Sequence, residues 1–452
     1  MSGSRGRGQG ATQFSGLRPP AAAELRVDRL GERSFRSPLA GVGRYFVDDD
    51  ERVLVSARLA DLDTDSGAGG PAAFEVAGPR EDLFFDPSEL VCGIVTCGGL
   101  CPGLNNVIRS LVMVLRQQYR VAAVYGFRYG YAGVVASSPV PPLLLDEDAV
   151  DRIHLHGGTM LGSSRGPQDI GAMVDNLARL GVRALFTIGG DGTQRGAAEI
   201  AQEARRRGID LAVIGIPKTI DNDVAWVERS FGFQTAVAEA DRVIDAAHVE
   251  AGGVWNGVSI VRLMGRHAGY IAAHATLANN DVNYCLVPEV PFALDGADGL
   301  LASLEQRLAE SRHAVIVVAE GAGQELFEGR SAGTDRSGNA RLFDIGVHLR
   351  DRVVAHAAER GHDWIVRYLD PSYAIRSLPA NASDAEFCFV LGQHAAHAAL
   401  AGRTNVVIGF WNQRFTHVPL PLVTGGKRRI TVGEPLWDRV LEATGQPTHL
   451  GA

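Results

Sequence analysis

Two carboxylates, a hydroxyl and an ammonium group lie close together in the segment Pro217-Lys218-Thr219-Ile220-Asp221-Asn222-Asp223. If this segment is extended, Asp221 and Asp223 project to the same side, because alternate residues of extended backbone share a face. Such a pair can provide a general base that takes a proton from a substrate hydroxyl, while the second carboxylate tunes the pKa of the first. Taken alone, however, the segment is better explained as a turn stabilised by Asp and Asn side chains, without a catalytic role.

A glycine-rich turn, Gly189-Gly190-Asp191-Gly192, stands between a predicted buried strand (184–188) and a predicted helix (193–207). Backbone N–H groups at the start of a helix bind anions, and glycines let a phosphate group approach them closely. Because phosphates already carry negative charge, the carboxylate of Asp191 is best explained as a ligand for Mg²⁺. A tight turn in which Asp191 only caps the helix explains this loop alone equally well.

Three arginines occur where a phosphate could be bound. Arg266, in Met264-Gly265-Arg266, follows a predicted strand and suits a phosphate or a transferring phosphoryl group. A salt bridge at a helix start is the alternative explanation for Arg266. Arg367 and Arg376 surround a Pro-Ser turn, where they can clamp one phosphate.

Two glutamates, Glu289 and Glu320, each end an apolar run. We interpret Glu289 as part of a solvated face, the usual place for a lone glutamate. Glu320 stands between a dry strand and a glycine, which makes it the better candidate to bind a sugar hydroxyl.

The elements that must position these residues alternate between strand and helix from residue 91 onwards. The pattern restarts at about residue 233, which indicates a second α/β domain. Such alternation predicts right-handed βαβ crossovers, parallel sheets covered on both faces, and ligands beyond the carboxyl ends of the strands. Two more glycine-rich loops (97–103 and 157–166) follow strands, so all three loops can meet in one crevice. The predicted strands are 91–96, 121–126, 184–188, 211–216, 258–263, 314–318, 364–368 and 405–410.

The composition is that of an ordinary globular protein. The chain has 452 residues, 46% hydrophobic and 21% charged, which suits two or three domains. Its net charge of −8 argues against nucleic acid or an anionic membrane as a partner. No apolar run reaches transmembrane length and no signal peptide is visible, so we expect a cytoplasmic protein with reduced thiols. Cys97 and Cys101 lack a second pair at the spacing of a zinc site.

Four motifs together resemble those of the 6-phosphofructokinase family, in its order and approximate spacing. The resemblance covers about residues 91–376 and is less distinct beyond. Residues 77–81, 85–87 and 96–103 are similar to the longer branch of plants and trypanosomes, which uses ATP. The four motifs are Gly98-Gly99 with Pro102-Gly103-Leu104-Asn105, Gly189-Gly190-Asp191-Gly192-Thr193, Pro217-Lys218-Thr219-Ile220-Asp221-Asn222-Asp223 and Met264-Gly265-Arg266.

This resemblance implies two similar three-layer α/β domains with mostly parallel sheets, an active site in the cleft between them, and assembly as a homotetramer. The implied order begins with a tail (1–20), which we predict to be disordered, and an N-terminal extension (21–90), which we predict to be irregular and packed on the main body. Within this extension we expect short strand-like pieces at 52–57 and 74–76, among loops rich in Asp, Gly and Pro. A nucleotide-binding domain (91–232) follows, completed by about residues 375–425. A sugar-phosphate-binding domain (233–374) and a C-terminal segment (426–452) complete the chain.

The resemblance also implies ATP and fructose 6-phosphate as substrates, Mg²⁺ as cofactor, and a glycolytic role. Asp221 is implied as the base on the 1-hydroxyl of the sugar, Thr219 and Arg266 as catalytic partners, and Asp191 as the metal ligand. The implied nucleotide-binding residues are Gly99, Arg128, Arg165, Gly166, Gly190, Asp191, Gly192, Thr193 and Lys218. Those implied for the sugar phosphate are Thr219, Ile220, Asp221, Met264, Gly265, Arg266, Glu320, Arg367, Tyr373 and Arg376.

The chain departs from the short bacterial enzymes of this family at two positions. They carry an arginine that reaches a neighbouring subunit's active site where this chain has Gly257, and a histidine where it has Tyr373. The subunit-crossing contact is therefore absent or supplied by other residues. The resemblance gives no basis for assigning the bacterial effector site to residues of this chain.

Gly192 and Lys218 bear on the phosphoryl donor in opposite directions. Family members that use pyrophosphate carry Asp at the first position and Lys at the second. An aspartate would place bulk and charge where the α-phosphate of a nucleotide must lie, whereas a lysine also suits ATP. We therefore predict ATP, with pyrophosphate as the alternative.

Two other functions are weighed against this one. NAD and lipid kinases share the Gly-Gly-Asp-Gly turn but lack the motif at 217–223. A non-catalytic regulatory subunit would need a damaged base or metal ligand, and both Asp191 and Asp221 are present.

Overall fold

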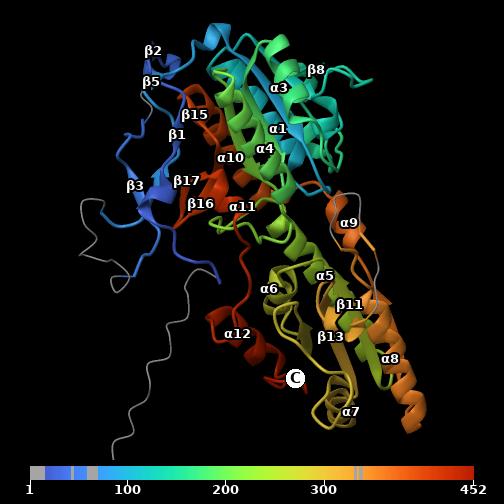
Figure 1. Ribbon diagram of the computed structural model, residues 1–452. Coiled ribbons are helices and arrows are strands. Elements are labelled where there is room, and N and C mark those ends of the chain that lie inside the picture. The colour runs from blue at the N-terminus through green and yellow to red at the C-terminus, as the bar shows by residue number, and fades with distance from the viewer. Residues whose placement is uncertain (1–15, 42–44, 59–69, 330–332, 335–339, 452) are drawn as a thin grey trace, which may run out of the picture.

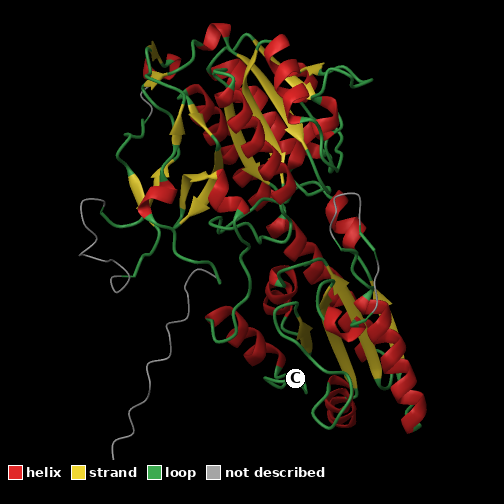
Figure 2. Ribbon diagram, in the orientation of Figure 1, coloured by secondary structure: helices red, strands yellow, loops and turns green. Residues whose placement is uncertain are grey.

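Two β-sheets organise the chain, one above the other in Figure 1. The computed structural model describes residues 16–41, 45–58, 70–329, 333–334 and 340–451. The larger sheet has nine strands in the order β3-β4-β17-β16-β10-β9-β6-β7-β8, and the smaller has four in the order β12-β13-β11-β14. Helices cover both faces of each sheet, so the predicted α/β class with two three-layer domains is confirmed (Figure 2).

The centre of the larger sheet is parallel and buried on both faces. Alternate residues of one strand belong to different cores: Ile214 packs in the core with α1 and α10, and Val213 in the core with α3 and α4. This double burial explains the continuous apolar runs in the sequence. The parallel strands are β6 (Val91–Thr96), β7 (Ala123–Phe127), β9 (Val182–Gly189), β10 (Ala212–Pro217) and β16 (Val406–Trp411); the helices are α1 (Leu104–Met113), α3 (Ile170–Arg179), α4 (Asp191–Arg206) and α10 (Ala382–Leu400).

Antiparallel strands complete the edges of this sheet, and two come from the N-terminal extension. β3 and β4 coincide with the strand-like pieces expected at 52–57 and 74–76, so these two expectations are confirmed. The carboxylate of Glu75 on β4 is buried and accepts hydrogen bonds from Arg403 Nε at 2.8 Å, with His417 Nδ1 at 2.9 Å. These contacts make the extension part of the folded domain. The edge strands are β3 (Arg52–Leu54), β4 (Ala73–Val76), β17 (Arg414–Pro419) and β8 (Leu143–Leu144).

The predicted disordered tail falls mainly on residues 1–15, which lie outside the described residues. Leu17 is described and is buried in the same core as Phe74. The prediction of disorder is therefore wrong for the end of this segment, because the apolar side chain of Leu17 has a core to enter. Minor elements nearby are α2 (Glu147–Val150) and the two-stranded pairs β1 (Asp28–Arg29) with β15 (Arg403–Thr404) and β2 (Phe35–Arg36) with β5 (Asp82–Leu83).

The second domain is a four-stranded parallel sheet between two helix layers. Residues of β13 alternate between the layers, with Val317 facing the core of α5 and α6 and Ile316 facing that of α7 and α8. Its strands are β11 (Gly257–Leu263), β12 (Tyr284–Leu286), β13 (His313–Ala319) and β14 (Ile365–Leu369). Its helices are α5 (Phe233–Gly252), α6 (Tyr270–Asn279), α7 (Leu300–Ser311), α8 (Ile345–Arg360) and α9 (Ser372–Ser377).

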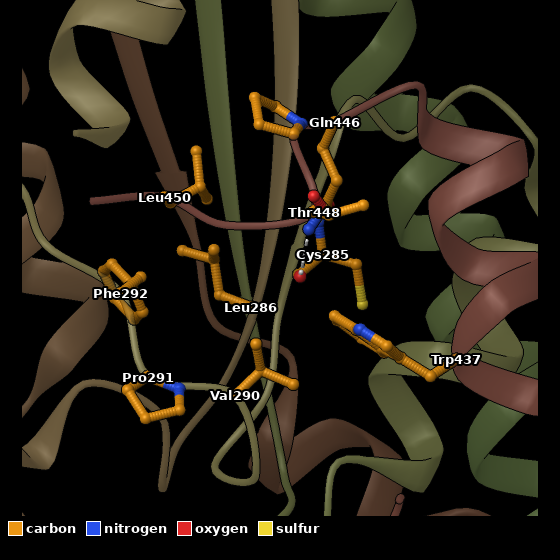
Figure 3. A pocket seen from close by; sticks show the side chains of 10 residues that line it. Cys285, Leu286, Val290, Pro291, Phe292, Trp437, Gln446, Thr448 and Leu450 are labelled. Carbon is orange, nitrogen blue, oxygen red and sulfur yellow. Dashed lines mark hydrogen bonds between the residues drawn. The ribbon is translucent and has the colours of Figure 1, made fainter. Parts of the chain in front are cut away.

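The C-terminal segment brings the chain into the second domain for the second time, after its first entry at α5. After β17 and α11 (Leu420–Thr424) the chain returns to the second domain, where α12 (Pro435–Thr444) packs against α6. Beyond α12, Gln446 Oε1 accepts a hydrogen bond from the backbone N–H of Cys285 at 2.7 Å, beside Trp437 (Figure 3). Among the described residues, no helix combines the length and apolar character that crossing a membrane would require.

Candidate active site

The glycine-rich loops 97–103 and 189–192 follow β6 and β9, as expected. The expectation that the loop 157–166 also directly follows a strand is wrong, because a 3-10 turn (Ile153–Leu155) precedes it. The hydroxyl of Ser163 donates to the carbonyl of Gly98 at 2.5 Å, which joins the loop 157–166 to the loop 97–103. Lys218 Nζ donates to the carbonyl of Gly99, in the loop 97–103, at 2.8 Å. The backbone N–H of Lys218 donates to the carbonyl of Gly189, at the start of the loop 189–192, at 3.0 Å, so Lys218 connects these two loops. The loops that the sequence predicted to come together are thus joined by direct contacts.

The β9–α4 turn shows which glycines the fold requires. A Cβ atom at Gly189 would lie 2.1 Å from the Thr193 side chain, so that position has no room for one. A Cβ at Gly192 would meet only Arg195 Nη2, at 3.9 Å. Packing therefore does not require glycine at 192, and its lack of a side chain leaves space in front of the first turn of α4.

The segment after β10 separates a structural residue from the chemical ones. Asn222 adopts a left-handed conformation (φ 55°), and its side chain binds the backbone of Glu228 and Ser230. The Thr219 hydroxyl donates to Asp223 Oδ1 at 2.9 Å. Asn222 is thus the residue of this segment that stabilises the turn. Asp221 takes no part in these turn contacts, so its carboxylate is available as a candidate base.

Asp221 has the properties of a general base. Its Oδ1 is buried and has no hydrogen-bond partner in the described part of the chain. Burial raises the pKa of Asp221 to about 7, and the negative charges of Asp223 and Glu320 add to this increase. A carboxylate with a pKa near neutrality can accept and release a proton at physiological pH.

Asp191 and Asp223 share a cation that the sequence analysis did not identify. Lys427 Nζ lies 2.9 Å from Asp191 Oδ2 and 2.5 Å from Asp223 Oδ2. Lys427 belongs to the C-terminal segment, far from both carboxylates in sequence. The basic run Lys427-Arg428-Arg429 after two glycines was the signal that could have drawn attention to it.

The donor set around Asp191 fits Mg²⁺ bound together with phosphates. Across the described residues, no group of three or more His, Cys, Asp or Glu side chains could enclose a metal ion. Mg²⁺ in phosphoryl-transfer sites uses one or two carboxylates, with waters and phosphate oxygens as its other ligands. Asp191, at the first position of α4, supplies such a carboxylate, and the nearby ammonium group shows that positive charge is accommodated there.

Lys218 is buried among the loops. Burial lowers the pKa of its ammonium group, and the positive charges of Arg165 and Arg376 also disfavour its charged form. An anion placed between these three residues would be attracted to all of them. Arg165 and Arg376 therefore face the same region as Lys218, although they come from different domains.

The backbone around Arg266 is closely packed. Gly265 has a positive φ of 130°, and a Cβ there would lie 2.7 Å from the carbonyl of Ala268. The guanidinium of Arg266 donates to the carbonyl of Ala340. Its backbone favours the ionised form of Asp221, which places the start of the β11–α6 loop beside the candidate base.

Arg376 and Tyr373 lie on the short helix α9. Arg376 Nε donates to the sulfur of Met264 at 3.0 Å, which brings α9 to the end of β11. Tyr373 is 80% exposed, and the Arg376 guanidinium lies 6.0 Å from its ring centroid.

Other predicted site residues have partners of their own in the protein. Glu320 pairs with Arg262 at 3.0 Å, and Arg367 pairs with Glu250 at 2.9 Å. Arg128 stacks on the ring of Tyr129 at 5.3 Å. These contacts do not bring Arg128 or Arg367 to Asp221.

The interpretation of Glu289 as part of a solvated face is wrong. Its Oε1 accepts hydrogen bonds from the backbone N–H groups of Gly269 at 3.1 Å and Ile430 at 2.9 Å. Burial raises the pKa of Glu289, while these bonds favour its ionised form. Glu289 therefore anchors the C-terminal segment to the second domain.

The model of the family described as "Phosphofructokinase" matches residues 91–399. The chain belongs to the phosphofructokinase family. It is 49% identical over 442 residues to the ATP-dependent 6-phosphofructokinase of Amycolatopsis methanolica (95% of this chain, 96% of the relative). It is also 46% identical over 428 residues to the ATP-dependent 6-phosphofructokinase of Trypanosoma cruzi (93% and 87%).

Solved phosphofructokinases share the fold. The pyrophosphate-dependent enzyme from Marinobacter aquaeolei superposes with a TM-score of 0.65 at 22% identity, covering 79% of this chain and 91% of that one. The T-state enzyme of Pichia pastoris gives 0.61 at 22% identity, covering 75% and 35%. The resemblance predicted from the four sequence motifs is confirmed, and membership of the NAD or lipid kinase families is excluded.

Proposed function

We propose that this chain is an ATP-dependent 6-phosphofructokinase, which transfers the γ-phosphoryl group of ATP to the 1-hydroxyl of D-fructose 6-phosphate. The observation that carries the proposal is a buried carboxylate, Asp221, with a raised pKa beside three converging glycine-rich loops. The curated relatives with 49% and 46% identity bear the same name, which supports it. The products are fructose 1,6-bisphosphate and ADP.

The glycine-rich loops form the nucleotide side of the proposed site. Backbone N–H groups at the start of α4 and the ammonium group of Lys218 are suited to phosphate oxygens. Arg128, whose guanidinium lies over the ring of Tyr129, is proposed near the adenine. The proposed nucleotide-binding residues are Gly99, Arg128, Arg165, Gly166, Gly190, Asp191, Gly192, Thr193 and Lys218.

Asp191 is the proposed ligand for Mg²⁺. Asp191 would hold the ion, which would supply positive charge to offset the negative charge of the transferring group. Asp223 lies beside Asp191, and its Oδ1 accepts from Thr219, so it also fixes the loop that carries the base.

Asp221 acts on the sugar. It takes the proton from the 1-hydroxyl as the oxygen attacks the γ-phosphorus, and Arg266 stabilises the negative charge of the phosphoryl group in flight. Thr219 and Ile220 position Asp221, and Arg376 binds the 6-phosphate. The other proposed sugar-phosphate residues are Met264, Gly265, Glu320, Arg367 and Tyr373.

Pyrophosphate as donor is the second candidate, because Lys218 matches the residue of pyrophosphate-using members. The open space at Gly192 favours ATP, since nothing in the fold requires glycine there. The test is kcat/KM of the purified chain with each donor. We expect turnover with ATP and Mg²⁺ and negligible turnover with pyrophosphate. A higher value for pyrophosphate would reverse the assignment, and no turnover with either would favour a regulatory subunit.

We also propose a cytoplasmic homotetramer. Exposed apolar side chains occur on both domains, for example Val249 and Trp255 on the second and Tyr45 and Leu144 on the first, and such side chains can become buried where subunits meet. Light scattering of the purified protein tests the state, and a monomer at micromolar concentration would contradict it.

A further inference from the structure

The chain between the two domains passes directly over the proposed metal ligand. We define this C-terminal strap as residues 425–430, between α11 and the loop before α12. Lys427 makes an isolated antiparallel bridge with Val224, and the backbone N–H of Arg428 donates to the carbonyl of Asp223 at 2.9 Å. The strap therefore runs beside the segment that carries Asp221.

The strap is fixed independently of the Lys427 side chain. Arg428 Nη1 donates to the carbonyls of Val227 at 2.8 Å and Glu228 at 3.0 Å. At the other end, the backbone N–H of Ile430 donates to Glu289. These contacts hold the lysine backbone at the rim of the site, while its long side chain can change partners.

Electrostatics explains the present position of the Lys427 side chain. Asp223 has a side chain only 4% exposed, and that of Asp191 is 26% exposed. Two carboxylates brought together at low exposure repel one another unless a cation lies between them. Burial lowers the pKa of Lys427, but the two carboxylates outweigh burial and raise it.

We propose that Lys427 is a positioning residue that holds the Asp191–Asp223 pair with an internal positive charge and yields Asp191 to the metal of the nucleotide complex. This inference rests on the proposed function, which makes Asp191 the Mg²⁺ ligand. The ammonium group and Mg²⁺ compete for Asp191 Oδ2. After exchange Lys427 keeps Asp223, so the Thr219–Asp223 contact beside the base is preserved. The strap thereby connects metal occupancy with the Glu289 anchor on the second domain.

The competition predicts a change in metal affinity without any turnover. Mn²⁺ is titrated into the full-length protein without nucleotide, and free Mn²⁺ is followed by electron paramagnetic resonance. Lys427→Met should bind Mn²⁺ about five- to tenfold more tightly than the wild type, the effect of removing one charge at a partly exposed site. Lys427→Arg, which retains the charge, should remain near the wild-type value.

Arg429→Met provides the matched control. Arg429 lies on the same strap, is exposed, and carries the same charge. Its loss should leave Mn²⁺ affinity within about twofold of wild type, because its charge is screened by solvent. An equal increase in both methionine variants would mean that only the net charge of the strap matters, and would overturn the proposal.

Thermal unfolding gives a second measurement that separates positioning from simple loss of structure. In EDTA, Lys427→Met should unfold at a lower temperature than wild type, because two carboxylates lose their cation. Saturating MgCl₂ should restore most of the lost unfolding temperature, and should raise the unfolding temperature of the variant more than that of the wild type. A variant that is destabilised equally with and without Mg²⁺, or that has unchanged Mn²⁺ affinity, would refute the proposal.

These outcomes are separate from the test of the proposed function. If the enzyme is active but Lys427→Met has unchanged metal affinity, the proposed role of Lys427 is wrong and the proposed function stands. A chain inactive with both donors would remove the proposed function, whatever the Mn²⁺ titration showed.

Discussion

The nucleotide side and the sugar side of the candidate site are built from different groups. On the proposed nucleotide side, backbone carbonyls of the first glycine-rich loop accept hydrogen bonds from side chains, as in Ser163 Oγ to Gly98 and Lys218 Nζ to Gly99. On the sugar side, charged side chains are bonded to other protein groups, as in Glu320–Arg262 and Arg367–Glu250.

This difference indicates two ways of preparing a binding site. The glycine-rich loops are hydrogen-bonded to one another and to Lys218, so the fold itself forms the proposed nucleotide half. Arginine and glutamate side chains must exchange protein partners for substrate oxygens, which costs part of the binding energy. Substitutions on the nucleotide side should therefore act on donor use, and those on the sugar side mainly on KM for fructose 6-phosphate.

The largest effect is expected where the two sides meet, at Asp221. Asp221→Asn should lower kcat by roughly 10²–10⁴-fold, the contribution of a positioned base, with a smaller change in KM for the sugar phosphate. Steady-state kinetics with ATP measures both constants. Asp210→Asn, which changes a surface ion pair with Arg183, is the control and should have the wild-type kcat and KM. Near-normal kcat in Asp221→Asn would remove Asp221 from the mechanism.

The next effect tests the nucleotide side. Gly192→Asp should lower kcat/KM for ATP by about 10²–10³-fold, because a carboxylate facing a phosphate costs several kcal/mol. Since a Cβ at 192 meets only Arg195 Nη2 at 3.9 Å, the variant should fold normally, which circular dichroism and thermal unfolding can check. Gly192→Ala separates bulk from charge and should keep most of the activity. Normal use of ATP by Gly192→Asp would contradict the proposed site.

The sugar side should respond through binding. Arg376→Ala should raise KM for fructose 6-phosphate by about 10–100-fold, the value of a charged hydrogen bond, and leave KM for ATP nearly unchanged. Arg266→Ala should also lower kcat, because Arg266 is proposed to contact the group in flight. If both variants kept wild-type constants, the proposed phosphate contacts of this face would be wrong.

The pH dependence should follow the raised pKa of Asp221. Because the base must be ionised and its pKa is about 7, kcat/KM should fall about tenfold per unit as the pH drops below about 7. For stability the sign is opposite. The pKa of Asp221 is about 7 in the folded state and about 4 in the unfolded state, so between these pH values the folded state binds the proton more strongly. The contribution of Asp221 to the free energy of unfolding therefore falls as the pH rises from about 4 to about 7. Asp221→Asn should therefore raise Tm at pH 8, and a lowered Tm there would contradict the assigned burial effect.

The smallest effect tests whether Arg367 must leave its protein partner. Glu250 lies 2.9 Å from Arg367 and holds it on the exposed side of β14. Glu250→Gln should weaken this pair and lower KM for fructose 6-phosphate by about two- to threefold, since an exposed ion pair is worth about 1 kcal/mol or less. Glu239→Gln, on an exposed pair of the same helix, is the control. An unchanged KM would place Arg367 outside the sugar-phosphate site.

The local elements could be predicted closely from the sequence. The strand expected at 91–96 is β6 (Val91–Thr96), and the helix expected at 193–207 is α4 (Asp191–Arg206). Buried parallel strands give continuous apolar runs, and glycine turns mark their ends, so these signals lie within a few residues of the elements they describe. The edge strands β3 and β4 also match the strand-like pieces expected at 52–57 and 74–76, but their place in the larger sheet was not predicted, because β4 pairs with β17, which lies far along the chain.

The sequence by itself determined the family and the α/β class, and it marked Asp191 and Asp221 as candidate site residues, because each of these is encoded in a short motif. Only the tertiary structure decided which groups surround these carboxylates. The contacts of Lys427 with Asp191 and Asp223, and of Glu289 with Ile430, join segments that no local pattern connects. Side-chain charges act over distances in space, and the distance between two residues in space is fixed by the packing of whole domains rather than by the residues between them.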